Sequence, residues 1–481
     1  MSHAPNIPAV VIIGAGPAGL MAALTAARAG ARVIVFEQLP EPGVRLLATG
    51  GGHCNFTNTL ATEDFIRHFG AKSRFVAPAI KALNGNRLRL FFGEMGIPSH
   101  SPDGFHVFPV SDSARSIRDA LRQACRKLGV EFRFNSRVDS LQIDRGQVMG
   151  IITSRGTESA AGVVLAAGGA SYKSLGGGES GFRLARKAGH TIVPLCPALV
   201  PLVTRETWPA TLAGVSLPRV TVSLACQDEA PARSLVCQDE APARSLACQD
   251  EAPARSLAFQ GNAREAATGS LLFTHQGISG PVVLDISGSV SSALRTRASV
   301  VVMLDLAPDR TIEAWQGHIE RLRKGHGAKA VLSMLAESLP AALAKVVLDR
   351  VPITPPVARL RRPGSAGALR PGESATPRRG GYRDATLLSV ARLSREQSRK
   401  LIMLIKNLPL TIVGTEGFGK AMVTKGGINL AEVCPKTLES KRVHGLFFAG
   451  EILDVDGPCG GFNLQWAFSS GFLATQNLSN Q

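Results

Sequence analysis

Hydrophobic residues near the N-terminus follow the pattern of a buried strand, a tight turn and a helix. Residues 9–13 are apolar, an alanine-rich stretch with helical spacing comes after them, and a second apolar run follows. Gly14, Gly16 and Gly19 form G-x-G-x-x-G where the first run meets the helix, and Glu37 ends the second run. Strand, glycine turn, helix and acid at this spacing predict the first βαβ unit of a dinucleotide-binding domain.

Each glycine has a separate physical reason in such a unit. Gly14 makes the tight turn, Gly16 lets the backbone approach a pyrophosphate, and Gly19 lets the helix pack closely on the strand. The phosphates would lie at the helix N-terminus, where free N–H groups and the helix dipole favour anions. Glu37 would bind a ribose hydroxyl, and it argues against a 2′-phosphate because two anions would meet. The alternative is a buried βαβ unit without a ligand.

Beyond this unit the pattern divides into a mixed region, a β-rich region and a helical region. A buried strand at 162–169 ends in small residues, which permit close approach of a ligand. The other expected strands lie at 105–109, 130–134, 137–143, 147–154, 219–225, 270–273, 282–286 and 299–304. The expected helices lie at 113–128, within 311–350 and 384–407, and from residue 466 onward.

An internal repeat of period eleven interrupts the β-rich region at 223–258. A proline in each full copy forbids a continuous helix. Three short copies also bury too little surface to form a solenoid. We therefore expect a solvated loop that lengthens a hairpin.

Composition favours a globular protein with two or three domains. The chain has 481 residues, of which 44% are hydrophobic and 19% charged. Of its 8 cysteines, those outside the repeat are scattered, and no Cys/His spacing suits zinc. The apolar stretch 9–27 contains three glycines and a proline, which favours a strand and helix over a membrane span. The first strand leaves no room for a signal peptide, so we expect a cytoplasmic protein without a metal site or a membrane span.

The formal net charge of +17 raises the question of a nucleic-acid partner. Part of this charge is concentrated in a linker rich in proline and glycine at 352–385 and in the residues just after it. No aromatic residues that could stack on bases alternate with the basic ones there. We therefore interpret the stretch as a solvated basic linker and expect no specific nucleic-acid partner.

Two C-terminal segments complete a second half of the dinucleotide motif. An apolar run leads into Gly450 and Glu451, and Gly460 and Gly461 precede the last helix. This looks like the second FAD motif of two-lobed flavoproteins, in which the helix N-terminus faces the flavin C2 carbonyl. The cofactor is therefore expected to be FAD rather than NAD. The chain has no second G-x-G-x-x-G after a strand, so NAD(P)H would bind transiently over the flavin.

Four ordered motifs resemble those of the BaiN/RdsA-like family of bacterial NAD(P)/FAD-dependent oxidoreductases. They lie at 47–58, 273–281, 423–428 and 450–463. The chain departs from the family pattern at His53 and Phe462, where arginine and tyrosine are usual, and in its loop with three glycines at 176–178. If this loop shapes the substrate pocket, the substrate differs from that of the relatives.

The resemblance implies the fold class and the domain division. The class is α/β, with a split Rossmann-like FAD-binding domain and an inserted β-barrel-like plus helical domain. The FAD-binding domain would comprise 1–195 and 409–481, and the insertion would comprise 196–408.

The motifs and the resemblance together assign the cofactor-binding residues. Val138 lies in the strand that usually presents its backbone to the adenine. The assigned residues are Gly14, Ala15, Gly16, Pro17, Ala18, Gly19, Glu37, Gln38, Arg45, Gly51, Gly52, Cys54, Asn55, Val138, Ala167, Gly168, Gly450, Glu451, Gly460, Gly461, Asn463 and Leu464.

Three residues are candidates for catalysis, and each has a structural alternative. Cys54 lies in the glycine loop, but no C-x-x-C partner accompanies it, so packing is the alternative. His275 lies in the inserted domain and could donate a proton, or it could fix its loop. Tyr172 could polarise a carbonyl group of the substrate, or simply pack beside the flavin strand.

The expected function is that of an FAD-dependent oxidoreductase. NAD(P)H would reduce the flavin, and hydride would pass to a small organic, enone-like acceptor, as the family link to bile-acid reductases implies. One alternative is an amine oxidase that uses O₂. The others are a tRNA-modifying flavoprotein and a non-catalytic FAD-binding module.

Overall fold

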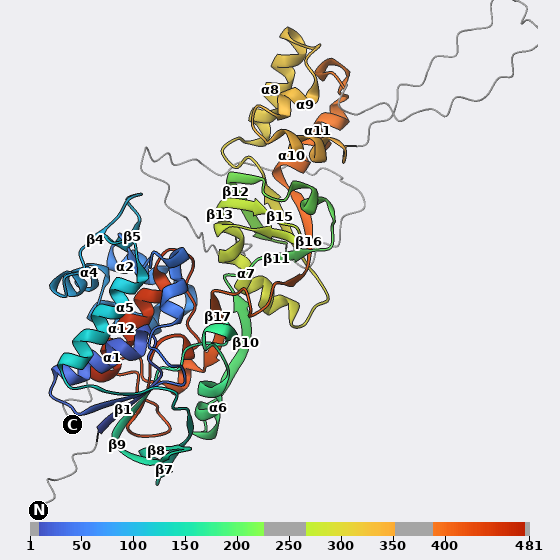
Figure 1. Ribbon diagram of the computed structural model, residues 1–481. Helices are drawn as coiled ribbons and strands as arrows, with labels where there is room; N and C mark the ends of the chain where they lie inside the picture. Colours follow the sequence, from blue (N-terminus) through green and yellow to red (C-terminus); the bar gives the residue numbers. More distant parts are fainter. Residues whose placement is uncertain (1–8, 226–265, 352–387, 477–481) are drawn as a thin grey trace, which may run out of the picture.

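The computed structural model describes residues 9–225, 266–351 and 388–476 (Figure 1). Nearly all of the predicted repeat loop and the whole predicted basic linker lie outside these residues. The described chain forms a Rossmann-like part, a barrel and a group of helices. In Figure 1 the barrel lies between the other two.

β1 (Ala9–Ile13) lies inside the Rossmann-like sheet, and all 5 of its residues are buried. It pairs in parallel with β2 (Val33–Phe36) on one side and with β9 (Gly156–Leu165) on the other. β6 (Glu131–Arg133) extends the sheet beyond β2. β18 (Leu446–Phe448) pairs in parallel with the C-terminal half of β9. One sheet thus joins both ends of the chain, which confirms the split Rossmann-like domain.

The N-terminal half of β9 joins an antiparallel extension of this sheet. β8 (Gln147–Thr153) pairs with β9, and β7 (Val138–Asp144) pairs with β8. A separate small sheet contains β3 (Thr57–Asn58), β5 (His106–Pro109) and β4 (Ser99–His100), in that order.

The first and last helices pack together in the Rossmann-like part. α1 (Pro17–Arg28) contacts α12 (Phe462–Gln476), and α5 (Ala114–Lys127) lies beside α1. The contact with α12 is close, because a Cβ added at Gly471 would lie 2.2 Å from the Ala18 carbonyl oxygen. The other helices here are α2 (Thr62–Arg67), α3 (Ser73–Ala82), α4 (Gly85–Glu94) and α6 (Ser180–Lys187).

Six antiparallel strands form a closed barrel, which confirms the barrel-like domain that the family resemblance implied. In barrel order they are β11 (Leu202–Thr204), β14 (Gly277–Ser279), β13 (Ala266–Phe273), β12 (Ser216–Leu224), β15 (Val300–Asp305) and β16 (Leu408–Thr415). Val222, Phe273 and Leu304 belong to its fully buried core. β16 pairs with β11 as far as Thr415, so the barrel continues past the boundary expected at residue 408.

α7 (Pro281–Leu294) stands where the sequence predicted a strand at 282–286, and that prediction is wrong. The run is apolar and β-branched, and over so short a length periodicity does not separate a strand from a buried helix. Gly280 adopts φ +94°, and Pro281 takes the first helical position, so together they start a helix. The buried residues that follow, as far as Val290, keep helical spacing.

The helical group shares one hydrophobic core with the barrel. Its members are α8 (Ile312–Gly325), α9 (Val331–Leu335), α10 (Ala341–Leu348) and α11 (Arg395–Lys406), all within the predicted helical regions. Trp315 is fully buried in this core.

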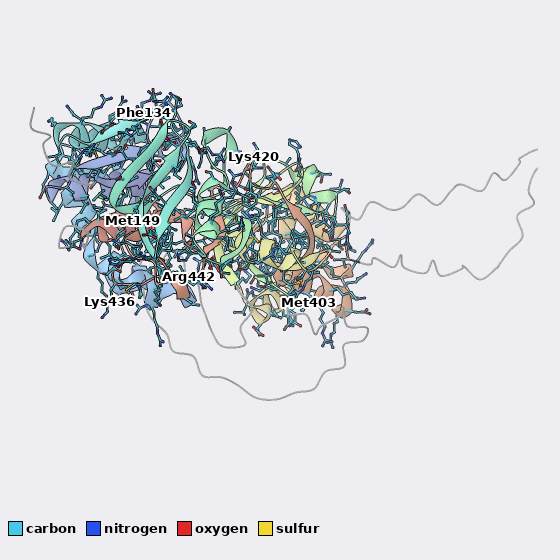
Figure 2. The ribbon with its side chains drawn as sticks, turned by 90° about the horizontal axis from the view of Figure 1, so that it is seen from below. Phe134, Met149, Met403, Lys420, Lys436 and Arg442 are labelled. Atoms are coloured by element: carbon cyan, nitrogen blue, oxygen red, sulfur yellow. The ribbon has the colours of Figure 1, made fainter. Side chains whose placement is uncertain are left out.

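The chain crosses between the Rossmann-like part and the barrel along two antiparallel strands, β10 (Ile192–Ala198) and β17 (Val423–Ile428). Beyond them, the Met422 N–H donates to the Leu199 carbonyl at 3.2 Å, which keeps the two crossing segments together. Figure 2 shows Lys420, from the connection between β16 and β17, at the upper edge of the molecule, to the right of Met149 of β8 and to the left of Met403 of α11.

Candidate functional site

A cavity of about 410 Å³ lies where the two ends of the chain meet. The glycine turn after β1, the end of β2 and the end of β9 line it from the N-terminal side. Residues around Gly450 and Gly460 line it from the C-terminal side. Leu199, Met422 and Val423 add apolar wall from the two crossing segments. The cavity therefore touches each part of the chain that the sequence connects with FAD.

The three N-terminal glycines differ in what a side chain would meet. Gly14 has φ +102°, and an added Cβ would lie 2.5 Å from the Ala166 carbonyl oxygen. An added Cβ at Gly19 would lie 1.9 Å from the Gly14 carbonyl oxygen. At Gly16 it would meet no atom within 4 Å, and Gly16 lines the cavity. This matches a turn, a packing contact and an open approach for phosphate at the start of α1.

Glu37 holds the glycine turn against the end of β2. Its carboxylate accepts the Ala15 N–H at 2.7 Å and the Leu39 N–H at 2.9 Å. Burial raises the pKa of Glu37, and these backbone donors act against the rise. Each carboxylate oxygen has two lone pairs, so Glu37 retains acceptor capacity toward a ribose hydroxyl.

Arg45 and Glu451 form an ion pair inside the cavity wall. Arg45 Nη2 lies 2.7 Å from Glu451 Oε2, and both side chains are about four-fifths buried. The other oxygen, Oε1, accepts the Thr424 N–H at 2.7 Å. Arginine carries five N–H donors, so Arg45 can bind a phosphate while it stays paired with Glu451.

Thr424 anchors the end of β9 where it meets the cavity. Its Oγ1 accepts the Ala170 N–H at 2.8 Å and the Ser171 N–H at 3.2 Å. An added Cβ at Gly169 would lie 2.4 Å from Glu451 Oε1 and 2.5 Å from Thr424 Oγ1. Only glycine fits there, and this close packing brings Gly168 and Ala167 to the cavity surface.

The C-terminal glycine loop, residues 457–461, is held from within and from the N-terminal part. The Asn463 side chain accepts the Gly457 N–H at 2.9 Å and donates to the Gly457 carbonyl at 2.8 Å. Asn58 Nδ2 donates to the Gly460 carbonyl at 2.8 Å. An added Cβ at Gly461 would lie 2.5 Å from the Thr57 carbonyl oxygen. The loop that starts α12 therefore has a fixed shape.

A cluster of four charged side chains lies just before this loop. Lys72 Nζ contacts Asp454 at 2.8 Å and Asp456 at 2.6 Å, and Lys425 Nζ lies 3.3 Å from Asp456. Burial opposes ionisation of Asp456, but Lys425 and Lys72 outweigh it and lower the pKa of this carboxyl. The arrangement fits a structural role for Asp454 and Asp456.

Most residues that the sequence assigns to the cofactor line this one cavity. They are Gly14, Gly16, Pro17, Ala18, Glu37, Gln38, Arg45, Gly51, Asn55, Val138, Ala167, Gly168, Gly450, Glu451, Gly460, Gly461, Asn463 and Leu464. Ala15, Gly19, Gly52 and Cys54 are outside its lining. The contacts of all these residues with FAD stay predictions.

The three catalytic candidates have different surroundings. Tyr172 lines the cavity with a positive φ of +54°, and its N–H donates to the Phe418 carbonyl. Cys54 is fully buried outside the lining, and burial raises the pKa of its thiol to about 12. His275 lies exposed in the turn between β13 and β14, also outside the lining.

Several cavity residues escaped the sequence analysis. Cys459, Leu199, Met422 and Val423 line the cavity, although none was assigned a role. Cys459 stands directly before Gly460, so its position in the motif offered a signal. Leu199 adopts φ +49°, which no local pattern of an apolar residue announces.

Within the described ranges, no group of three or more His, Cys, Asp or Glu side chains could hold a metal ion. None of the helices in the described part of the chain is long and apolar enough to cross a membrane.

A Rossmann-like sheet completed from both chain ends, around a cavity with an open glycine turn and a phosphate-competent arginine, defines the class of FAD-dependent oxidoreductases with a split cofactor domain. The family described as HI0933-like protein Rossmann domain matches residues 8–477. The chain belongs to this family, which confirms the resemblance found in the sequence motifs.

Several relatives match almost the whole chain, and two of them illustrate the range of their names. The 3-dehydro-bile acid delta(4,6)-reductase of Clostridium scindens is 31% identical over 96% of this chain and 97% of its own length. The ribosomal RNA dihydrouridine synthase of Haemophilus influenzae is 28% identical, with 98% of both chains covered. Among solved structures, a 3-ketosteroid delta1-dehydrogenase from Sterolibacterium denitrificans has a TM-score of 0.48 and 12% identity, covering 98% of this chain and 99% of the other.

Proposed function

We propose that the protein uses NAD(P)H and FAD to reduce a carbon–carbon double bond conjugated with a carbonyl group in a small organic molecule. The observation that carries the proposal is the shared cavity, whose apolar wall of Leu199, Met422 and Val423 adjoins the C-terminal glycine loop. This wall offers space for an apolar substrate beside the expected flavin position. NAD(P)H would bind there transiently.

The two relatives support this acceptor class. One is named as a delta(4,6)-reductase of a 3-dehydro-bile acid, and the other as a dihydrouridine synthase. Dihydrouridine differs from uridine by reduction of a double bond conjugated with a ring carbonyl. Both names therefore describe reduction of an enone-like group.

The reaction adds hydride to one carbon of the double bond and a proton to the other. FAD supplies the hydride chemistry when it is bound. Tyr172 is the candidate that lines the cavity, and we assign it to hydrogen-bond the substrate carbonyl. The buried Leu199 and Val423 would keep water away from the reacting carbons.

A second candidate substrate is a uracil base in RNA. The ribosomal RNA relative and the formal net charge of +17 favour it. An RNA substrate would contradict the expectation of no specific nucleic-acid partner. Assays with a small enone and with RNA therefore distinguish the two hypotheses.

The test is an anaerobic half-reaction followed by an acceptor. Purified protein with FAD is mixed with NADH or NADPH, and flavin absorbance is followed. A 4,6-dien-3-one steroid or a uridine-containing RNA transcript is then added, and a product heavier by two hydrogens is sought by mass spectrometry. Failure of both nicotinamides to bleach the flavin sinks the proposal. Peroxide release with amine substrates and O₂ would favour the amine oxidase alternative.

The role assigned to Tyr172 is tested separately. Tyr172→Phe should slow acceptor reduction about 10- to 100-fold while FAD affinity stays unchanged. His275→Asn is the matched control, because this side chain is exposed outside the cavity lining, and it should retain the rate within about twofold.

We also propose a domain division close to the predicted one. The Rossmann-like domain would contain residues 1–195 and the chain after β16, and the insertion would run from residue 196 to Thr415. A cytoplasmic location remains a proposal, which the thiols of Cys54, Cys125 and Cys196, outside any disulfide in the described part, support.

A further inference from the structure

One face of α7 in the inserted domain meets the Rossmann-like part. Ser287 Oγ accepts the Val200 N–H at 3.1 Å, at the first crossing between the parts. An added Cβ at Gly288 would lie 3.3 Å from both Ala198 Cβ and Lys425 Cδ. Leu284 clusters with Leu199 and Val423, and Cys459 packs on this cluster. In Figure 1, α7 lies at the end of the barrel toward β17 and β10.

Asp285 lies on the same face and contacts the C-terminal glycine loop directly. Its Oδ1 accepts the Cys459 N–H at 2.8 Å. The loop thus has three supports: Asn463 from inside, Asn58 from the N-terminal segment and Asp285 from the insertion.

 

The shape of the turn at Gly280 decides where Asp285 stands. Gly280 has φ +94°, and an added Cβ would lie 2.7 Å from the Ser270 carbonyl oxygen and 3.0 Å from the Leu272 N. Any other residue would shift the start of α7 relative to β13. Pro281 then begins the helix, so that Asp285 follows one turn later. The motif at 273–281 thereby sets the position of a carboxylate without supplying one itself.

We propose that Asp285 is a positioning residue, through which the inserted domain fixes the C-terminal glycine loop against the FAD. The acceptor oxygen of Asp285 sets the direction of the Cys459 peptide group. The N–H groups of the residues that follow lie at the N-terminus of α12. FAD binding geometry therefore depends on docking of α7. The proposal rests on the FAD cofactor and not on the identity of the electron acceptor.

The experiment compares Asp285→Ala, Asp285→Asn and Ser287→Ala in the full chain. Asparagine keeps an acceptor oxygen, and Ser287→Ala perturbs the same face of α7 without touching the loop. FAD affinity is measured by fluorescence titration, and the visible spectrum and midpoint potential of the bound flavin are recorded. We expect about tenfold weaker FAD binding and a shifted spectrum for Asp285→Ala. Asp285→Asn and Ser287→Ala should stay within about twofold of the unmodified protein.

Two results would overturn the proposal. One is unchanged FAD affinity, spectrum and potential in Asp285→Ala. The other is an equal effect in Ser287→Ala or in Asp285→Asn, because then general docking or the charge, and not the Cys459 hydrogen bond, would be responsible. These readouts concern the flavin alone, so a wrong acceptor in the proposed function would leave them unaffected.

Discussion

Arg45 Nη2 donates to Glu451 Oε2 at 2.7 Å, and this bond joins residues separated by 406 positions in the chain. Both side chains line the cavity, and both are about four-fifths buried. The pair therefore connects the two cofactor segments and also faces the expected pyrophosphate.

Arg45→Ala should weaken FAD binding and lower stability together. Removal of one partner leaves the Glu451 carboxylate partly buried without its cation, which costs about 1.5–3 kcal/mol. FAD titration and thermal unfolding, each with and without FAD, measure the two effects. Arg186→Ala removes an exposed arginine 3.9 Å from Glu179 and should change stability by less than about 0.5 kcal/mol. Equal behaviour of the two variants would contradict the prediction.

Gly16→Ala should reduce FAD affinity, whereas Gly19→Ala should reduce the stability of the fold. At Gly16 the added methyl meets no atom, so the apoprotein should keep its stability and lose FAD affinity. At Gly19 it would lie 1.9 Å from the Gly14 carbonyl oxygen. Glycine to alanine inside a helix normally stabilises by about 1 kcal/mol. Because of the close contact, we nevertheless expect Gly19→Ala to lower the free energy of unfolding measured in a denaturant titration. An unchanged or increased free energy of unfolding would refute the packing role of Gly19.

Cysteine labelling should distinguish the two cysteines nearest the cofactor motifs. The thiol of Cys54 is fully buried with a pKa of about 12, so it should resist iodoacetamide at pH 8 in the folded protein. Cys459 lines the cavity and should react, and FAD should protect it. Peptide mass spectrometry measures both sites, with unfolded protein as the positive control. Rapid labelling of Cys54 in the native state would contradict the structure.

His190 should make stability fall as the pH is lowered. Its side chain is fully buried, and burial lowers its pKa although Glu432 acts in the opposite direction. The unfolded state then binds the proton more readily, so stability is complete above about pH 6.5 and declines below it. His190→Gln should flatten the loss of melting temperature between pH 7 and 5. The exposed His326→Asn is the control and should follow the unmodified protein.

The first βαβ unit could be predicted because its signals are local. Turn, helix start and acid all lie within residues 9–37, and the apolar run of β1 has both neighbours in the sheet. The C-terminal partner was recognised through Gly450 and Gly460, whose spacing is also local. Its pairing with β9 joins segments that are distant in sequence, and no local pattern predicts it.

Other features depend on tertiary contacts that no local pattern contains. The strand predicted at 282–286 is part of α7, because a short apolar run does not separate a strand from a buried helix, and its packing in the barrel core decides. The left-handed backbone of Leu199 and the bond from Cys459 to Asp285 each arise between segments that are distant in sequence. Leu199, Met422 and Val423 line the cavity because the fold brings the two crossing segments to it, and no local pattern predicts this.

The pairing of β18 with β9 has a consequence during biosynthesis. The ribosome synthesises the chain from its N-terminus, so the residues of β9 are made long before residues 446–448, with which they pair. Its exposed edge must wait while the barrel and the helical group, which have a core of their own, emerge and fold. Because residues within 449–467 line the cavity, it is complete only after they have been made, and we expect the cofactor to bind after that point.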